Sequence, residues 1–153
     1  MFKHILLPTD GSDISRRTAS RAVSFAREAG ASITAFHAKP DYPFSFLGEG
    51  GLVDPVTPES FADMTEAQAQ KYLAEIEEMC KAAGVPCNKI SQTNSLPHEA
   101  IIEAAESTGC DLIFMASHGR RGLSSLLLGS ETNKVLTHTH IPVLVYRQDS
   151  KAD

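Results

Sequence analysis

Two short stretches of the sequence carry residue types that suit the binding of an anionic ligand. The longer one is Ser117-His118-Gly119, then nine residues, Arg120 to Leu128, and then Gly129-Ser130. Glycine lets backbone N–H groups approach phosphate oxygens, and a serine at a helix start adds a hydroxyl beside the positive end of the helix dipole. Arg120 and Arg121 add local positive charge. The pattern fits a phosphate-binding loop, and an ordinary strand-to-helix turn explains the glycines equally well.

The second stretch follows a short apolar run near the start of the chain. Ile5-Leu6-Leu7 is stopped by Pro8, and Thr9-Asp10-Gly11-Ser12 comes next. Asp10 can contact a ligand hydroxyl or a metal ion, but an Asp before Gly-Ser equally forms a turn by hydrogen bonding its own backbone. His118 can likewise bond a phosphate or only cap its loop. The residues alone leave both questions open.

Alternating strand and helix signals must position these two stretches. Apolar periodicity, helix caps and Gly or Pro stops define the elements. Strands are predicted at 3–7, 31–38, 87–92, 111–116 and 142–146, and helices at 13–29, 58–83, 95–109 and 131–137. The buried stripe of the long helix is predicted to be Phe61, Met64, Tyr72, Leu73, Ile76, Met79, Cys80 and Ala83. The class is therefore α/β, with a mainly parallel sheet and right-handed crossovers.

This class fixes where a ligand should bind. In open parallel sheets ligands lie beyond the carboxyl ends of the strands, where the strand order reverses. The loops 8–12 and 117–130 are therefore the candidate site. The stretch 39–57 is rich in Pro and Gly among aromatic residues and reads as a long loop or lid. We expect 1–153 to form a single domain that ends in a polar tail, 147–153.

Composition excludes several classes of protein. The 153 residues are 42% hydrophobic and 22% charged, with 14 Lys and Arg against 19 Asp and Glu. A net charge of −5 argues against a general nucleic-acid binder, which usually carries a basic stripe. No apolar run approaches the ~18 residues of a membrane span, and the N-terminal run is too short for a signal peptide. We expect a cytoplasmic protein with no membrane or nucleic-acid partner.

The cysteines suggest neither a metal site nor a redox motif. Cys80, Cys87 and Cys110 lack the paired CxxC spacing that zinc and redox sites use. We interpret them as reduced thiols, with Cys80 and Cys87 as buried residues around a helix end.

The two motifs together resemble the universal stress protein family, in its nucleotide-binding branch. The resemblance rests on Ile5 to Ser12, on Ser117-His118-Gly119 with its nine-residue spacer and Gly129-Ser130, and on the closing Ile141 to Val145. It spans the chain from Lys3 to Tyr146. The family motif is Gly, two residues, Gly, nine residues, Gly and Ser or Thr. Ala116 stands here at its first position.

The resemblance implies an adenine nucleotide alpha hydrolase-like fold. Its open five-stranded parallel sheet would have the order 3-2-1-4-5 and helices on both faces. ATP, or ADP or AMP, would bind with Mg²⁺ between the first and fourth strand ends. Asp10 would contact the ribose or a metal-bound water. The implied binding residues are Pro8, Thr9, Asp10, Ala38, Met115, Ala116, Ser117, His118, Gly119, Arg120, Gly129, Ser130, Glu131 and Thr132. A homodimer would pair the last strand, Val143, Leu144 and Val145, with its copy.

The expected function is a nucleotide-responsive regulatory or protective module in stress response. An enzyme on the same fold, hydrolysing ATP slowly or adenylating a substrate, is the first alternative. No lysine P-loop or GxSxG elbow is present in the sequence, so we expect at most weak ATPase activity. The second alternative is a stress protein that works through protein contacts and binds no nucleotide. A receiver domain needs a phosphoacceptor Asp on the third strand, and this sequence has none there. A flavodoxin needs aromatic residues to sandwich a flavin, and this chain has no Trp and only three Tyr.

Overall fold

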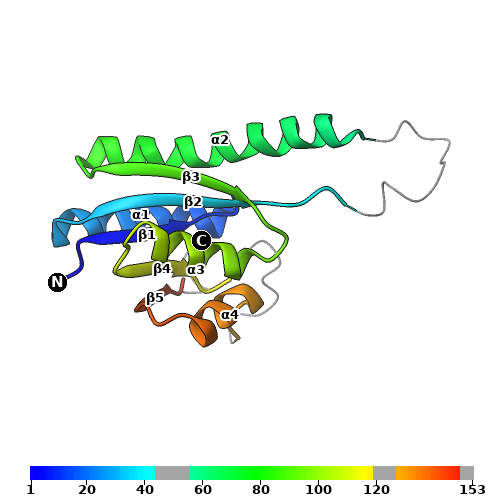
Figure 1. Ribbon diagram of the computed structural model, residues 1–153. Helices are drawn as coiled ribbons and strands as arrows, with labels where there is room; N and C mark the ends of the chain where they lie inside the picture. The colour runs from blue at the N-terminus through cyan, green and yellow to red at the C-terminus, as the bar shows by residue number, and fades with distance from the viewer. Residues whose placement is uncertain (44–55, 119–126, 149–153) are drawn as a thin grey trace.

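The computed structural model describes residues 1–43, 56–118 and 127–148. It contains five parallel strands in the order β3-β2-β1-β4-β5, which confirms the predicted fold (Figure 1). The strands are β1 (His4–Pro8), β2 (Ser32–Lys39), β3 (Cys87–Thr93), β4 (Leu112–Ala116) and β5 (Val143–Tyr146). The helices are α1 (Asp13–Ala29), α2 (Pro58–Ala83), α3 (Pro97–Ser107) and α4 (Ser130–His138). Among the described helices, none is both long and apolar enough to cross a membrane.

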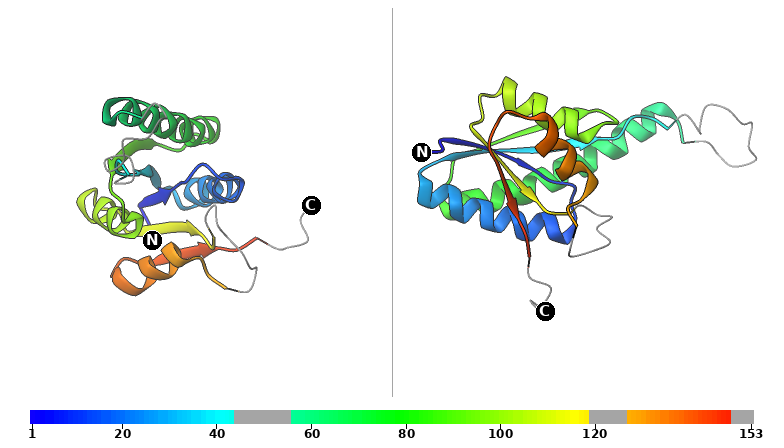
Figure 2. Two further views of the ribbon diagram at one scale, coloured as in Figure 1. Left: turned by 90° about the vertical axis from the view of Figure 1, so that its right-hand side faces the viewer. Right: turned by 90° about the horizontal axis from the view of Figure 1, so that it is seen from below.

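The helices cover both faces of the sheet, α1 and α2 on one side and α3 and α4 on the other (Figure 2). Two apolar cores result because successive strand residues point to opposite faces. In β1, Ile5 and Leu7 pack in the core under α1 and α2, while Leu6 packs in the core under α3 and α4. The central strand β4 is buried on both faces, as its apolar run predicts.

Local sequence explains where the two longer helices begin and end. Ser12 caps α1 by accepting a hydrogen bond from the Ser15 N–H, and Thr57 caps α2 in the same way. The helices end at Gly30 and Gly84, whose φ values of 68° and 72° are left-handed. A Cβ at either position would meet no atom within 4 Å, so the glycines serve backbone conformation alone.

The predicted elements are confirmed, with end residues that differ by at most two positions. One core assignment is wrong, because Met64 is 50% exposed and the buried stripe of α2 runs through Thr65, Ala69, Leu73, Ile76 and Cys80. A helix of 26 residues spans about 39 Å, longer than the eight-residue strand β2 at about 26 Å. Its first turns therefore extend past the sheet (Figure 1).

Asp111 ties the start of β4 to β1. Its carboxylate accepts the N–H groups of Lys3 at 2.8 Å and His4 at 3.0 Å. Burial opposes ionisation of this carboxyl, but the two N–H groups outweigh it and hold the pKa of Asp111 below its usual value.

Of the predicted lid, residues 44–55 lie outside the described part of the chain, as do 149–153 of the predicted tail.

Candidate functional site

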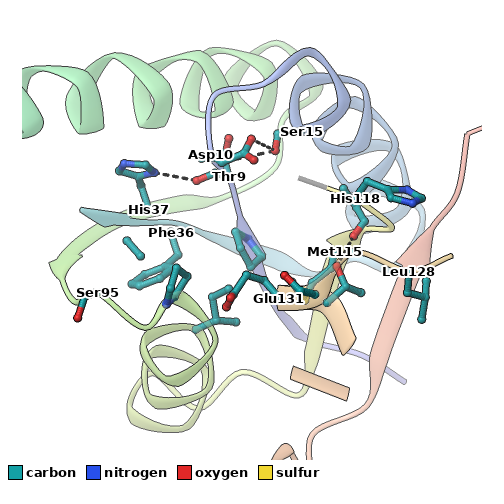
Figure 3. Close-up of a pocket in the computed structure, with 18 of the residues that line it drawn as sticks. Thr9, Asp10, Ser15, Phe36, His37, Ser95, Met115, His118, Leu128 and Glu131 are labelled. Carbon is teal, nitrogen blue, oxygen red and sulfur yellow. Dashed lines mark hydrogen bonds between the residues drawn. The ribbon is translucent and has the colours of Figure 1, made fainter. Parts of the chain in front are cut away.

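A cavity of about 820 Å³ opens at the carboxyl ends of β1 and β4 (Figure 3). From β1 the chain crosses through α1 to β2 on one side, and from β3 it crosses through α3 to β4 on the other. The strand order therefore reverses between β1 and β4, where open α/β sheets bind ligands. The volume lies within the range of about 300–1,000 Å³ that is usual for small-molecule sites.

Most of the residues singled out in the sequence line this cavity. They are Pro8, Thr9, Asp10, Ala38, Met115, Ala116, His118, Gly129, Ser130, Glu131 and Thr132. Ser117 is buried, with 4% of its surface exposed, and does not line the cavity. Gly119 and Arg120 lie outside the described residues. Two loops that are more than a hundred residues apart in the sequence thus meet at one end of the sheet.

The first of these loops is held rigidly by its own side chains. The Asp10 Oδ1 atom accepts the Ser12 N–H at 2.9 Å and the Ser15 hydroxyl at 2.7 Å. This is the turn-forming role left open in the sequence. Gly11 has φ +77°, and a Cβ there would lie 2.3 Å from the Tyr72 ring, so only glycine fits. The loop therefore presents Thr9 and Asp10 in a fixed position.

The second loop is closed by backbone hydrogen bonds at the end of β4. The Ser117 carbonyl accepts the Gly129 N–H at 2.7 Å, and the Ser117 N–H donates to the Tyr146 carbonyl at 3.0 Å. The buried Thr132 hydroxyl donates to the Ala116 carbonyl at 2.9 Å. These contacts fix the first turn of α4 against β4.

The amino end of α4 faces the cavity without a side-chain cap. Its N-cap is Gly129, with φ −61° and ψ 153°, and no side-chain capping bond is made. The first N–H groups of a helix lack partners within the helix and carry partial positive charge. Gly129 and Ser130 both line the cavity, so this end of the space suits an anion.

His118 sits beside this end of the cavity. Its Nδ1 atom lies 3.0 Å from the Ser117 hydroxyl oxygen. Its Nε2 atom is buried and has no hydrogen-bond partner among the described residues. A buried polar atom without a partner is uncommon and is often satisfied by a ligand or water. The position agrees with a phosphate contact as well as with a loop cap.

Glu131 brings a negative charge to the cavity wall, and its neighbours offset that charge. The Oε2 atom accepts the His98 N–H at 2.9 Å and lies 3.3 Å from His98 Nδ1, while Oε1 lies 3.4 Å from Lys134 Nζ. The N-cap residue of α3, Leu96, makes no side-chain capping bond, so Glu131 of α4 supplies an acceptor at the start of α3. The residue thus joins the two helices.

Eight residues that line the cavity were not among the binding residues named individually from the sequence: Ser15, Phe36, His37, Ser95, Pro97, Ile101, Leu127 and Leu128. His37 Nδ1 donates to the Thr9 carbonyl at 2.8 Å, and its ring packs edge-on against Tyr72 at 5.2 Å. Alternation along β2 could have identified Phe36, which shares a sheet face with Ala38. Leu127 and Leu128 fall within the predicted loop 117–130, whereas the other five depend on how loops and helices pack, and no motif marks them.

Comparison with known proteins identifies the family of this chain and agrees with its fold. Residues 1–147 match the universal stress protein family. A universal stress protein of Thermus aquaticus is 37% identical over 147 residues, which cover 96% of this chain and 100% of that protein. The chain belongs to the universal stress protein family.

Solved structures of the family share its architecture. The protein MJ0577 of Methanocaldococcus jannaschii superposes with a TM-score of 0.82 at 26% identity, covering 99% of each chain. A universal stress protein in complex with cAMP gives a TM-score of 0.68 at 22% identity, covering 97% of this chain and 98% of that one. One from Archaeoglobus fulgidus in complex with dAMP gives 0.65 at 18%, covering 95% and 97%. These two family members are thus in complex with adenine nucleotides.

Proposed function

We propose that this chain binds an adenine nucleotide, ATP or its di- or monophosphate, in the cavity between β1 and β4. The observation that carries the proposal is the cavity itself, which lies at the reversal of strand order and is lined by both predicted motifs. The cAMP and dAMP complexes of family members support the ligand class. Binding would make the protein a nucleotide-responsive regulatory or protective module, and we expect it to act in the cytoplasm.

The two ends of the cavity differ in chemistry in a way that suits a nucleotide. Phe36, Ala38, Ile101 and Met115 give an apolar part, where an adenine ring would lie. Gly129, Ser130 and His118 give a polar part beside the start of α4, where phosphates would lie. Thr9 and Asp10 lie on the loop after β1, and we assign them to the ribose.

Mg²⁺ would depend on the phosphates for much of its coordination. Among the described residues no group of three or more His, Cys, Asp or Glu side chains could hold a metal ion. Asp10 and Glu131 are the carboxylates that line the described cavity. Mg²⁺ usually keeps several waters and takes one or two carboxylates plus phosphate oxygens, so Asp10 fits as a water-mediated partner. Bound Mg²⁺ would offset phosphate charge.

We also propose a homodimer in which β5 pairs with its copy. Val143, Leu144 and Val145 form the edge strand next to β4, and each is only partly buried. An exposed edge presents unpaired N–H and C=O groups that proteins usually cover. Sedimentation at micromolar concentration should give a dimer, and a monomer would count against this pairing.

The nucleotide assignment is tested by mass spectrometry of the ligand that copurifies with the protein, together with one variant. Gly129→Leu should abolish nucleotide binding without unfolding the chain, because φ −61° suits any residue and Gly129 lines the end of the cavity that we assign to the phosphates. Ala74→Leu is the matched control, since Ala74 is exposed on α2 and does not line the cavity. Unchanged affinity in Gly129→Leu would overturn the assignment of this site.

A further inference from the structure

The last turns of α2 and the start of β3 bring two cysteines together. Cys80 lies one turn after Glu77 on the helix, and Cys87 lies two residues before Lys89 on the strand, so each pair shares a face. Glu77 and Lys89 form an ion pair of 3.1 Å between these two faces. Cys80 is buried in the apolar core on this face of the sheet, and the partly buried Cys87 packs against the same core, so the two thiols are neighbours. Neither is in a disulfide.

The surroundings give the two thiols different reactivity. Interaction with the neighbouring Cys80 thiol lowers the pKa of Cys87, helped by the backbone of Ala35 and by Lys89, and together these outweigh burial and the Glu77 charge. Interaction with Cys87, burial and the Glu77 charge raise the pKa of Cys80. The thiolate is the nucleophilic form of cysteine, so Cys87 is the reactive partner and Cys80 keeps its proton.

Access separates the pair further. Cys80 is 0% exposed, whereas Cys87 is only partly buried and lies on the edge strand β3. A small oxidant from solvent therefore reaches Cys87 first. Cys110 differs from Cys87, because it is only 6% exposed and burial raises its pKa.

We propose that Cys80 and Cys87 form a peroxide-reactive dithiol site in which Cys87 is oxidised first and Cys80 then closes a disulfide. The Cys87 thiolate attacks one oxygen of a hydroperoxide, the O–O bond breaks, and hydroxide or alkoxide leaves, which gives a sulfenic acid. The Cys80 sulfur then attacks the Cys87 sulfur. The S–S bond forms, the S–O bond breaks, and the Cys80 proton leaves with the hydroxyl group as water.

The site is separate from the nucleotide cavity. The start of β3 and the end of α2 lie at the amino end of the sheet, whereas the cavity lies at the carboxyl ends of β1 and β4 (Figure 1). The disulfide requires the two sulfur atoms to close to about 2.05 Å. Because β3 is an edge strand, it is hydrogen-bonded to β2 alone, and Cys87 is the thiol that would shift. Nucleotide affinity should therefore be the same in both redox forms.

Tryptic mapping after peroxide treatment tests the proposal directly. The purified full chain is treated with one equivalent of hydrogen peroxide, blocked with N-ethylmaleimide and digested. Cleavage after Lys81 and Lys89 places Cys80 in peptide 72–81 and Cys87 in peptide 82–89, while Cys110 falls in a third peptide. We expect peptides 72–81 and 82–89 to be linked, with the loss of two hydrogen atoms, and separated by dithiothreitol.

Two comparisons show whether the reaction is specific to Cys80 and Cys87. Without peroxide, N-ethylmaleimide should label Cys87 roughly tenfold faster than Cys110. In Cys80→Ser, peroxide should leave Cys87 as a sulfenic acid that dimedone traps, whereas Cys110→Ser should form the disulfide as the native chain does. If Cys80→Ser fails to fold, the linked peptides of the native chain still decide. Over-oxidation of Cys87 without linkage, equal reaction of Cys110, or no reaction would each overturn the proposal.

Discussion

Gly11→Ala gives the sharpest test of how the fold holds the first ligand loop. Two separate costs arise at this position. The left-handed φ of +77° costs about 1–2 kcal/mol for a residue with a Cβ. The new Cβ would also lie 2.3 Å from the Tyr72 ring, and overpacking of this kind costs about 1–3 kcal/mol. Together the free energy of unfolding should fall by roughly 2–5 kcal/mol.

Gly30→Ala is the matched control for the first cost. Gly30 has φ +68° with nothing within 4 Å of a Cβ, so it should lose only the backbone share, about 1–2 kcal/mol. Urea unfolding of both variants measures the difference. The ring contributes the remainder, so Gly11→Ala should cost less in a Tyr72→Ala background than in the native chain. Equal losses for Gly11→Ala and Gly30→Ala would refute this reasoning.

The same variant links the loop to ligand binding. Gly11 precedes the N-cap of α1 and follows Thr9 and Asp10, which line the cavity. Displacing the loop should weaken nucleotide binding in Gly11→Ala, whereas Gly30→Ala should bind as the native chain does. Calorimetric titration at a temperature where both variants are folded measures this. Native affinity in Gly11→Ala would separate the loop from the site.

Three further changes test individual contacts. Thr132→Val removes the hydroxyl that donates to the Ala116 carbonyl and should lower the free energy of unfolding by about 1 kcal/mol. The exposed control Thr137→Val should lower it less. Urea unfolding measures both variants, and the opposite ranking would contradict this expectation. Asp111→Asn should lower the free energy of unfolding at pH 7. Because the pKa of Asp111 is lowered in the folded state, the difference in unfolding free energy between variant and native chain should shrink as pH falls below about 4. A difference that stays constant with pH would contradict this expectation. Glu131→Gln removes a negative charge from the cavity wall, so ATP affinity measured by calorimetry should rise a few-fold, with the increase smaller at high salt; a weaker complex would mean that Glu131 organises the site instead.

Much of the fold could be predicted from the sequence because local signals agreed with one another. The capping residues Ser12 and Thr57 and the glycines 30 and 84 mark helix ends that the structure reproduces. The continuous apolar run of β4 indicates a central strand, and β4 lies between β1 and β5. The order 3-2-1-4-5 came from family resemblance, since periodicity does not specify how parallel strands are arranged.

The candidate site, like the fold, could be predicted only in part from the sequence. Both motif loops could be located, because glycines and polar residues follow strands whose carboxyl ends must meet. His37 and the Glu131–His98 contact could not, since they depend on the packing of β2, α3 and α4 against one another. The exposure of Met64 was missed because an apolar stripe alone does not reveal how far a helix extends past its sheet.

The central claim is that the cavity between β1 and β4 holds an adenine nucleotide. Isothermal titration of the nucleotide-stripped protein with ATP and Mg²⁺ tests it most directly. We predict saturable heat at one nucleotide per chain, lost in Gly129→Leu and kept in Ala74→Leu. No heat with ATP, ADP or AMP, with or without Mg²⁺, would contradict the account.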